Sequence, residues 1–153
     1  MNKENVFLVV GGDLRQVYTA KKLAENNKVY AAGFDNNIIG DSNVIHVDHK
    51  LELPEIADYI ILPLPASQNG GFVNAPFCRN NIPLTSLAPL LKCDGIIFGG
   101  KIDPSTMKIF NKCGIKTVDY FEREELNVLN AVPTAEGAVQ IAMEEMASTI
   151  YGQ

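Results

Sequence analysis

Strand-like and helix-like segments alternate along this chain of 153 residues, and that alternation restricts the fold more than any other feature. Five apolar, β-rich runs lie at residues 6–10, 29–32, 59–62, 95–98 and 116–118. Helical patterns occupy residues 14–26, with Asp13 as the expected N-cap, and residues 104–112. Because parallel strands need crossover connections, the sequence predicts an α/β fold: a flavodoxin-like or Rossmann-like three-layer sandwich around a parallel five-stranded sheet.

Five such strands favour the spatial order 2-1-3-4-5, in which the chain reverses direction between the first and third strands. A further short strand is expected at residues 44–47, and a last helix at residues 135–150. Ligands of these sheets bind outside the carboxyl ends of the strands, next to the reversal. We therefore expect residues 11–16, 63–71 and 99–101 to meet and form a site.

Candidate substrate-binding residues follow from that placement: Gly12, Asp13, Arg15, Pro65, Ser67, Gly100 and Lys101. Arg15 falls in the first turn of a helix, where the helix dipole disfavours a cation. A guanidinium beside free helix N–H groups suits a carboxylate ligand. An ion pair with Asp13 is the alternative for Arg15. Ser67 and Lys101 can equally belong to ordinary surface loops.

The glycine-rich segment after the first strand differs from the dinucleotide fingerprint G-x-G-x-x-G. Asp13 and Gln16 stand at its second and third glycine positions, and a carboxylate there would repel a pyrophosphate. We therefore expect no cofactor bound to this domain. Asp35, however, lies where a ribose-binding acid would follow, so a stand-alone Rossmann-like module that binds a small molecule or nucleotide without catalysis stays as the alternative.

Composition excludes several other classes of function. The net charge of −5 argues against a nucleic acid partner, and no apolar stretch approaches the roughly 20 residues that span a bilayer. Three widely spaced cysteines and the pair His46 and His49 do not form a metal-ligand pattern, so no metal site is expected. Proline at position 63 disfavours a receiver domain, which needs an acceptor aspartate there. No self-contained catalytic set is visible, and no catalytic residue is assigned.

Several segments, in order along nearly the whole chain, resemble the N-terminal domain of the dipicolinate synthase A subunit. This family is related to the catalytic domains of 2-hydroxyacid and alanine dehydrogenases. The matching segments are residues 10–16 (VGGDLRQ), 33–35 (GFD), 61–63 (ILP), 97–100 (IFGG), 121–124 (FERE) and 130–137 (NAVPTAEG).

The resemblance implies that residues 1–153 form the substrate-side domain of a cytoplasmic oxidoreductase subunit in the mother cell of a sporulating bacterium. It also implies a second, Rossmann domain that binds NAD or NADP, which we expect to lie beyond this sequence, leaving the fragment inactive alone. The flavin-binding B subunit of dipicolinate synthase would be the partner, and a homo-oligomer is a further expectation. Together the two subunits would convert a dihydrodipicolinate-type intermediate of the lysine (diaminopimelate) pathway to dipicolinate. That small dicarboxylate would need cations such as Arg15 and Lys101.

Overall fold

A computed structural model describes residues 4–35, 38–40, 43–68 and 71–122 of the chain. The helix expected at residues 135–150 lies outside the described residues. No helix within the described part is long and apolar enough to cross a membrane.

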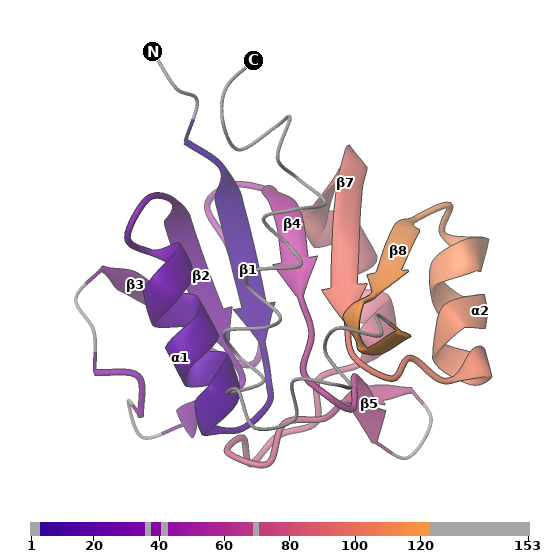
Figure 1. The fold of residues 1–153 in the computed structure, drawn as a ribbon, viewed down its shortest axis with the longest axis horizontal. Helices are drawn as coiled ribbons and strands as arrows, with labels where there is room; N and C mark the ends of the chain where they lie inside the picture. Colours follow the sequence, from indigo (N-terminus) through magenta and orange to yellow (C-terminus); the bar gives the residue numbers. More distant parts are fainter. Residues whose placement is uncertain (1–3, 36–37, 41–42, 69–70, 123–153) are drawn as a thin grey trace.

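The centre of the structure is a six-stranded sheet in the order β3-β2-β1-β4-β7-β8, and all five pairings are parallel (Figure 1). The predicted order of the five main strands is confirmed, as is the reversal between the first and third of them. The short strand expected at residues 44–47 forms as β3 and adds a sixth strand at the edge. The strands are β1 (Val6–Val10), β2 (Lys28–Ala32), β3 (Val44–Val47), β4 (Ala57–Ile61), β7 (Leu91–Gly99) and β8 (Lys116–Asp119).

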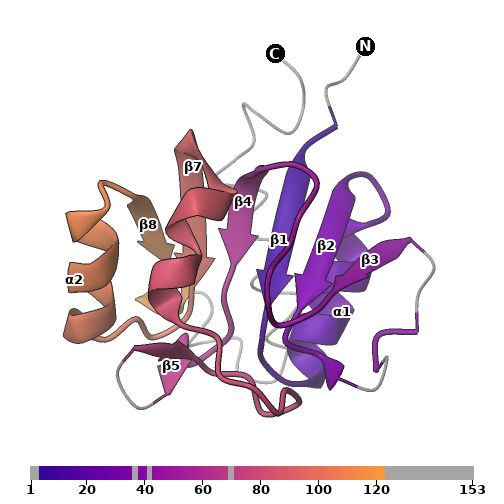
Figure 2. The ribbon, with the colours of Figure 1, turned by 180° about the vertical axis from the view of Figure 1, so that it is seen from behind.

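Both faces of the sheet are covered, which explains why the central strands are apolar throughout rather than alternating. Helix α1 (Leu14–Leu23) packs on one face, where Phe7 and Val9 point, and helix α2 (Pro104–Lys112) packs on the other, where Leu8 and Val10 point. The 3₁₀ turns η2 (Leu84–Ser86) and η3 (Ala88–Leu90) lie on the same side as α2 (Figure 2). The three-layer sandwich predicted from the sequence is therefore confirmed.

Both helices begin at an aspartate, because its carboxylate satisfies backbone N–H groups that the first helical turn leaves without partners. Asp13 accepts a hydrogen bond from the backbone N–H of Arg15 at 3.0 Å, as its expected N-cap role requires. Asp103 accepts from the backbone N–H of Thr106 at 2.8 Å, with Pro104 at the first helical position.

The segment after β4 returns across the carboxyl end of the sheet before β7 begins. It contains a small antiparallel hairpin, β5 (Ser67–Gln68) with β6 (Phe72–Val73), and the first of these strands lies below the strand ends in Figure 1. Val73 and Ile82 anchor the segment in the core. The last described element is the 3₁₀ turn η4 (Tyr120–Glu122), directly after β8.

Candidate functional site at the carboxyl end of the sheet

The three segments expected to meet do meet, around the turn that follows β4. Arg15 Nη2 donates to the carbonyl of Leu64 at 3.3 Å, which joins the start of α1 to this turn. On the other side, the backbone N–H of Ala66 donates to the carbonyl of Gly100 at 2.8 Å. A Cβ placed on Gly12 would lie 2.9 Å from Pro63 Cβ, so the first glycine loop also packs against the turn. The structure thus brings the predicted residues to one edge of the sheet; their binding of a substrate stays a prediction.

Asp13 and Arg15 form an ion pair at this edge, as the alternative for Arg15 anticipated. Arg15 Nη2 lies 3.0 Å from Asp13 Oδ2, and Arg15 Nε donates to Asp13 Oδ1 at 3.0 Å. Partial burial alone would raise the pKa of Asp13, but the side-chain and backbone hydrogen bonds from Arg15 outweigh it and hold the pKa below its usual value. The Arg15 side chain keeps 43% exposure, so the pair orients the guanidinium without burying it.

Ser67 has a structural partner that the sequence did not indicate. Its hydroxyl donates to Asp103 Oδ2 at 2.5 Å, and the hydroxyl of Thr106 lies 3.0 Å from Ser67 Oγ and 2.9 Å from the same carboxylate oxygen. Burial acts to raise the pKa of Asp103, but hydrogen bonds from Ser105, Ser67 and Thr106 bring it well below its usual value. The Ser67 hydroxyl therefore donates to the cap of α2 and attaches the hairpin to that helix, and its binding of a substrate stays a prediction.

Pro65, Gly100 and Lys101 lie where the turn after β4 meets the loop after β7. The amide Nδ2 of Asn74 donates to the carbonyl of Pro65 at 3.1 Å. Gly100 is buried, and a Cβ there would lie 2.8 Å from both Leu64 Cβ and Tyr120 Cε2, so only glycine fits. Lys101 is exposed and has a φ of 52°, a left-handed backbone conformation that residues with a side chain rarely adopt.

Three residues that hold this edge together were missed from the sequence: Asn74, Asp119 and Tyr120. Asp119 and Tyr120 directly follow a predicted strand, and that position is a signal that could have marked them. Tyr120 is fully buried, its hydroxyl donates to the carbonyl of Leu62 at 3.0 Å, and burial raises its pKa. No local pattern distinguishes Asn74 from the other polar residues of its loop.

The backbone and carboxylate groups that would hold a dinucleotide are engaged by the chain itself. The N–H of Gly12 donates to the carbonyl of Asn74 at 2.8 Å, and the Asp13 carboxylate caps the helix at the pyrophosphate position. Asp35, where a ribose-binding acid was considered, accepts from the backbone N–H of Arg79 at 2.8 Å. The segment from Asn74 to Arg79 therefore lies over the groups that a nucleotide would need.

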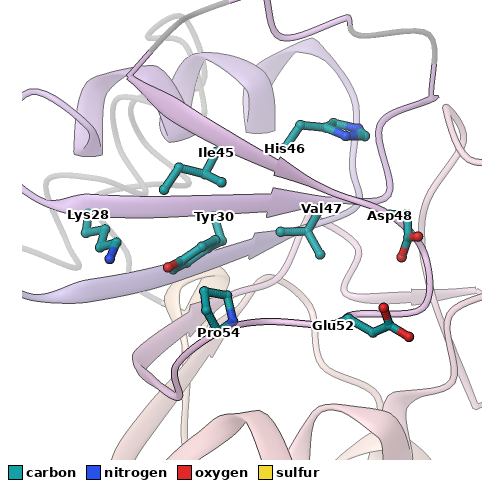
Figure 3. Close-up of a pocket in the computed structure, with 8 residues that line it drawn as sticks. All are labelled: Lys28, Tyr30, Ile45, His46, Val47, Asp48, Glu52 and Pro54. Carbon is teal, nitrogen blue, oxygen red and sulfur yellow. The ribbon is translucent and has the colours of Figure 1, made fainter.

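A separate hollow of about 330 Å³ lies at the β2–β3 edge (Figure 3). Two of its polar lining residues share Glu55 as a partner: the Tyr30 hydroxyl donates to Glu55 at 2.8 Å, and Lys28 forms an ion pair with the same carboxylate at 2.5 Å. Across the described part of the chain, no group of three or more His, Cys, Asp or Glu side chains is placed to hold a metal ion. The hollow is lined by Lys28, Tyr30, Ile45, His46, Val47, Asp48, Glu52 and Pro54.

The parallel sheet, its strand order and the polar residues at its carboxyl end define a Rossmann-like α/β domain. Shikimate dehydrogenase 1 from Peptoclostridium difficile shares this fold, with 16% identity and a TM-score of 0.54 over 92% of this chain and 48% of that one. Within this class, residues 6–121 match the family described as the N-terminal domain of the dipicolinate synthase A subunit. The chain belongs to that family.

Individual relatives agree with this assignment. The dipicolinate synthase A subunit of Bacillus subtilis is 30% identical over 150 residues, covering 94% of this chain and 49% of the relative. Its crystal structure superimposes with a TM-score of 0.75 at 28% identity, again over 94% and 49%. The crystal structure of the corresponding Bacillus halodurans protein shares the fold, with a TM-score of 0.75 at 24% identity, over 94% and 50%. This chain spans about half the length of these relatives.

Proposed function

We propose that this chain is the substrate-side domain of a dipicolinate synthase A subunit and that its carboxyl-end site binds a small dicarboxylate. The position of Arg15 carries the proposal. Its guanidinium lies where the ends of β1 and β4 meet, held by Asp13 and by the carbonyl of Leu64 at 3.3 Å. Family membership supplies the ligand class, because dipicolinate is an aromatic ring with two carboxylates.

A dicarboxylate of this kind needs positive charge at both ends, and the site has two exposed cations. Arg15 follows β1 and Lys101 follows β7, and these strands flank β4 on its two sides. Neighbouring strands are about 4.8 Å apart, so β1 and β7 are separated by roughly 10 Å. That separation suits two long cationic side chains reaching the opposite carboxylates of one small ring. Gly12, Asp13, Pro65 and Gly100 would form the wall between them.

The full-length protein would be an oxidoreductase. We assign NAD or NADP to its other half, a flavin to the partner B subunit, and a dihydrodipicolinate-type substrate to the carboxyl-end site. On becoming aromatic the substrate would lose a hydride and a proton; the nicotinamide cofactor, when bound, would supply the hydride-accepting chemistry, and the proton would pass to solvent. The present chain would orient the dianion through Arg15 and Lys101, and alone it would be inactive. This activity would belong to the mother cell of a sporulating bacterium.

Titration of the ¹⁵N-labelled chain with pyridine-2,6-dicarboxylate at millimolar concentration tests the proposal. We expect saturable chemical-shift changes at residues 11–16 and 99–101. Arg15→Gln should weaken the binding by about tenfold, because a charge-assisted contact is lost. Lys21→Gln removes the same charge from the far end of α1 and should leave binding unchanged. Absence of any shift in these segments would refute a dicarboxylate site here.

The alternative, a nucleotide-binding module, is less well supported because Gly12, Asp13 and Asp35 already have hydrogen-bond partners within the chain. Titration with NAD and NADP separates the two functions. We expect no saturable binding at micromolar concentration. Micromolar binding that perturbs the amides of Gly12 and Asp35 would favour the nucleotide module instead.

A further inference from the structure

The loop after β7 holds a lysine in a conformation that costs free energy. Lys101 has a φ of 52°, and a side chain in this left-handed region crowds the following carbonyl oxygen. Glycine adopts the same conformation without that penalty. Across the described residues, no hydrogen bond or ion pair of the Lys101 ammonium offsets the cost. A strained residue of this kind at the candidate binding site points to a side chain that contacts a ligand and not another part of the protein.

Asp119 accepts hydrogen bonds from the turn that contains Lys101. Its Oδ1 accepts hydrogen bonds from the backbone N–H groups of Lys101 at 3.0 Å and Phe121 at 2.9 Å, and its Oδ2 accepts from that of Ile102 at 2.8 Å. Asp119 stands at the end of β8, directly beside Gly99 at the end of β7. One carboxylate thus holds the turn that contains Lys101 from the neighbouring strand.

The rest of the loop is fixed against the β4 turn, so Lys101 cannot relax by moving the loop as a whole. The N–H of Gly100 donates to the carbonyl of Pro63 at 3.1 Å, and the carbonyl of Gly100 accepts from Ala66 at 2.8 Å. Gly100 is buried, whereas Lys101 next to it is exposed. The loop therefore presents one exposed cation next to the turn that follows β4.

We propose that Asp119 is a positioning residue whose carboxylate fixes the left-handed turn at Lys101 and so places the lysine ammonium as the second cation of the dicarboxylate site. This inference rests on the proposed function, and it adds a residue that acts only through Lys101. Because Asp119 uses its carboxylate on backbone N–H groups, it would contribute no direct contact to the ligand.

A thermodynamic cycle on dicarboxylate binding tests the inference, with pyridine-2,6-dicarboxylate as the probe and this chain as the protein. We expect Lys101→Gly to weaken binding by about tenfold and Lys101→Arg, which keeps the charge, to restore most of it. Asp119→Asn should weaken binding several-fold in the wild-type background and have no effect in the Lys101→Gly background. Asp94→Asn, the same change at an exposed position of β7, is the matched control.

One further measurement, thermal unfolding, separates this role from a general effect on folding. Lys101→Gly should raise the midpoint of thermal unfolding while binding falls, because glycine relieves the left-handed strain. Independent, additive losses from Asp119→Asn and Lys101→Gly would overturn the inference, as would unchanged binding in Lys101→Gly. Those results leave the dicarboxylate site standing if Arg15→Gln still weakens binding. If the wild-type chain does not bind the probe at all, the proposed function fails and this inference fails with it.

Discussion

Replacing Asp103 by alanine should destabilise this domain strongly, because one carboxylate holds both the start of α2 and the hairpin. The carboxylate caps α2 through the Thr106 N–H at 2.8 Å and also accepts hydrogen bonds from the hydroxyls of Ser67, Ser105 and Thr106. Loss of an N-cap costs about 1 kcal/mol. Thr106 is fully buried and would keep only Ser67 Oγ, at 3.0 Å, as its acceptor, while the Ser67 hydroxyl would lose its own acceptor. A buried hydroxyl that loses its acceptor adds about 1–3 kcal/mol. We expect a total loss of about 3 kcal/mol in the free energy of unfolding.

Single and double variants of Ser67 and Asp103 show how much of that loss comes from the hydrogen bond between them. The free energy of unfolding is measured by urea titration at pH 7, followed by circular dichroism. Ser67→Ala should cost about 1 kcal/mol, because Asp103 keeps its other donors. In the double variant with Asp103→Ala, the loss should be smaller than the sum of the two single losses by about 1 kcal/mol. Ser105→Ala removes an exposed hydroxyl from the same carboxylate and should cost no more than about 0.5 kcal/mol.

The same variants decide between two roles for Ser67. If Ser67→Ala leaves the free energy of unfolding unchanged and abolishes the response to pyridine-2,6-dicarboxylate, the structural reasoning is refuted and Ser67 is a ligand-binding residue after all. A loss of stability with unchanged binding would remove Ser67 from the predicted substrate site.

Three further predictions concern Gly100, Asp103 and Tyr120. Gly100→Ala should cost about 1–3 kcal/mol in urea unfolding, because its Cβ would lie 2.8 Å from Leu64 and Tyr120; Gly114→Ala has open space and only left-handed strain, about 1 kcal/mol. The pKa of Asp103 is lower in the folded state than in the unfolded state. Its contribution to the free energy of unfolding is therefore complete above the unfolded pKa of about 3.9 and is lost as the pH falls further. In Asp103→Asn the free energy of unfolding should depend less on pH in that acidic range. Tyr120→Phe removes the buried hydroxyl's hydrogen bond and should lower the free energy of unfolding in urea by about 1 kcal/mol.

The elements of the fold could be predicted because their signals are local. Continuous apolar runs indicated strands buried on both faces, and Asp13 and Pro104 indicated where helices begin. The strand order could be predicted because five strands that alternate with helices favour the order 2-1-3-4-5, which depends on the connections and not on individual side-chain contacts. Edge strand β3 was expected as a short strand, but its place in the sheet required knowledge of its pairing with β2.

The contacts of the site could not be predicted in the same way, because they join residues far apart in the sequence. The Ser67 hydroxyl donates to Asp103 across 36 positions, and the backbone N–H of Lys101 donates to Asp119 across 18 positions. Polar side chains in loops carry no periodicity, so the sequence shows that they are available but not which partner they find. The ion pair of Asp13 with Arg15 was foreseeable because only two positions separate its partners.

The glycines of the loop after β1 are required by the fold of this chain, but they do not indicate that it binds a nucleotide. Gly11 and Gly12 both have positive φ values, and a Cβ on Gly11 would lie 2.7 Å from the carbonyl oxygen of Asn74. In a dinucleotide-binding domain the corresponding glycines allow a pyrophosphate to approach the backbone. Here the close approach is made by the chain's own segment, so glycine is still required although its partner is a peptide carbonyl. The glycines alone therefore indicate a close approach to the backbone, and Asp13 and Gln16 at the other fingerprint positions indicate that the approaching group is not a phosphate.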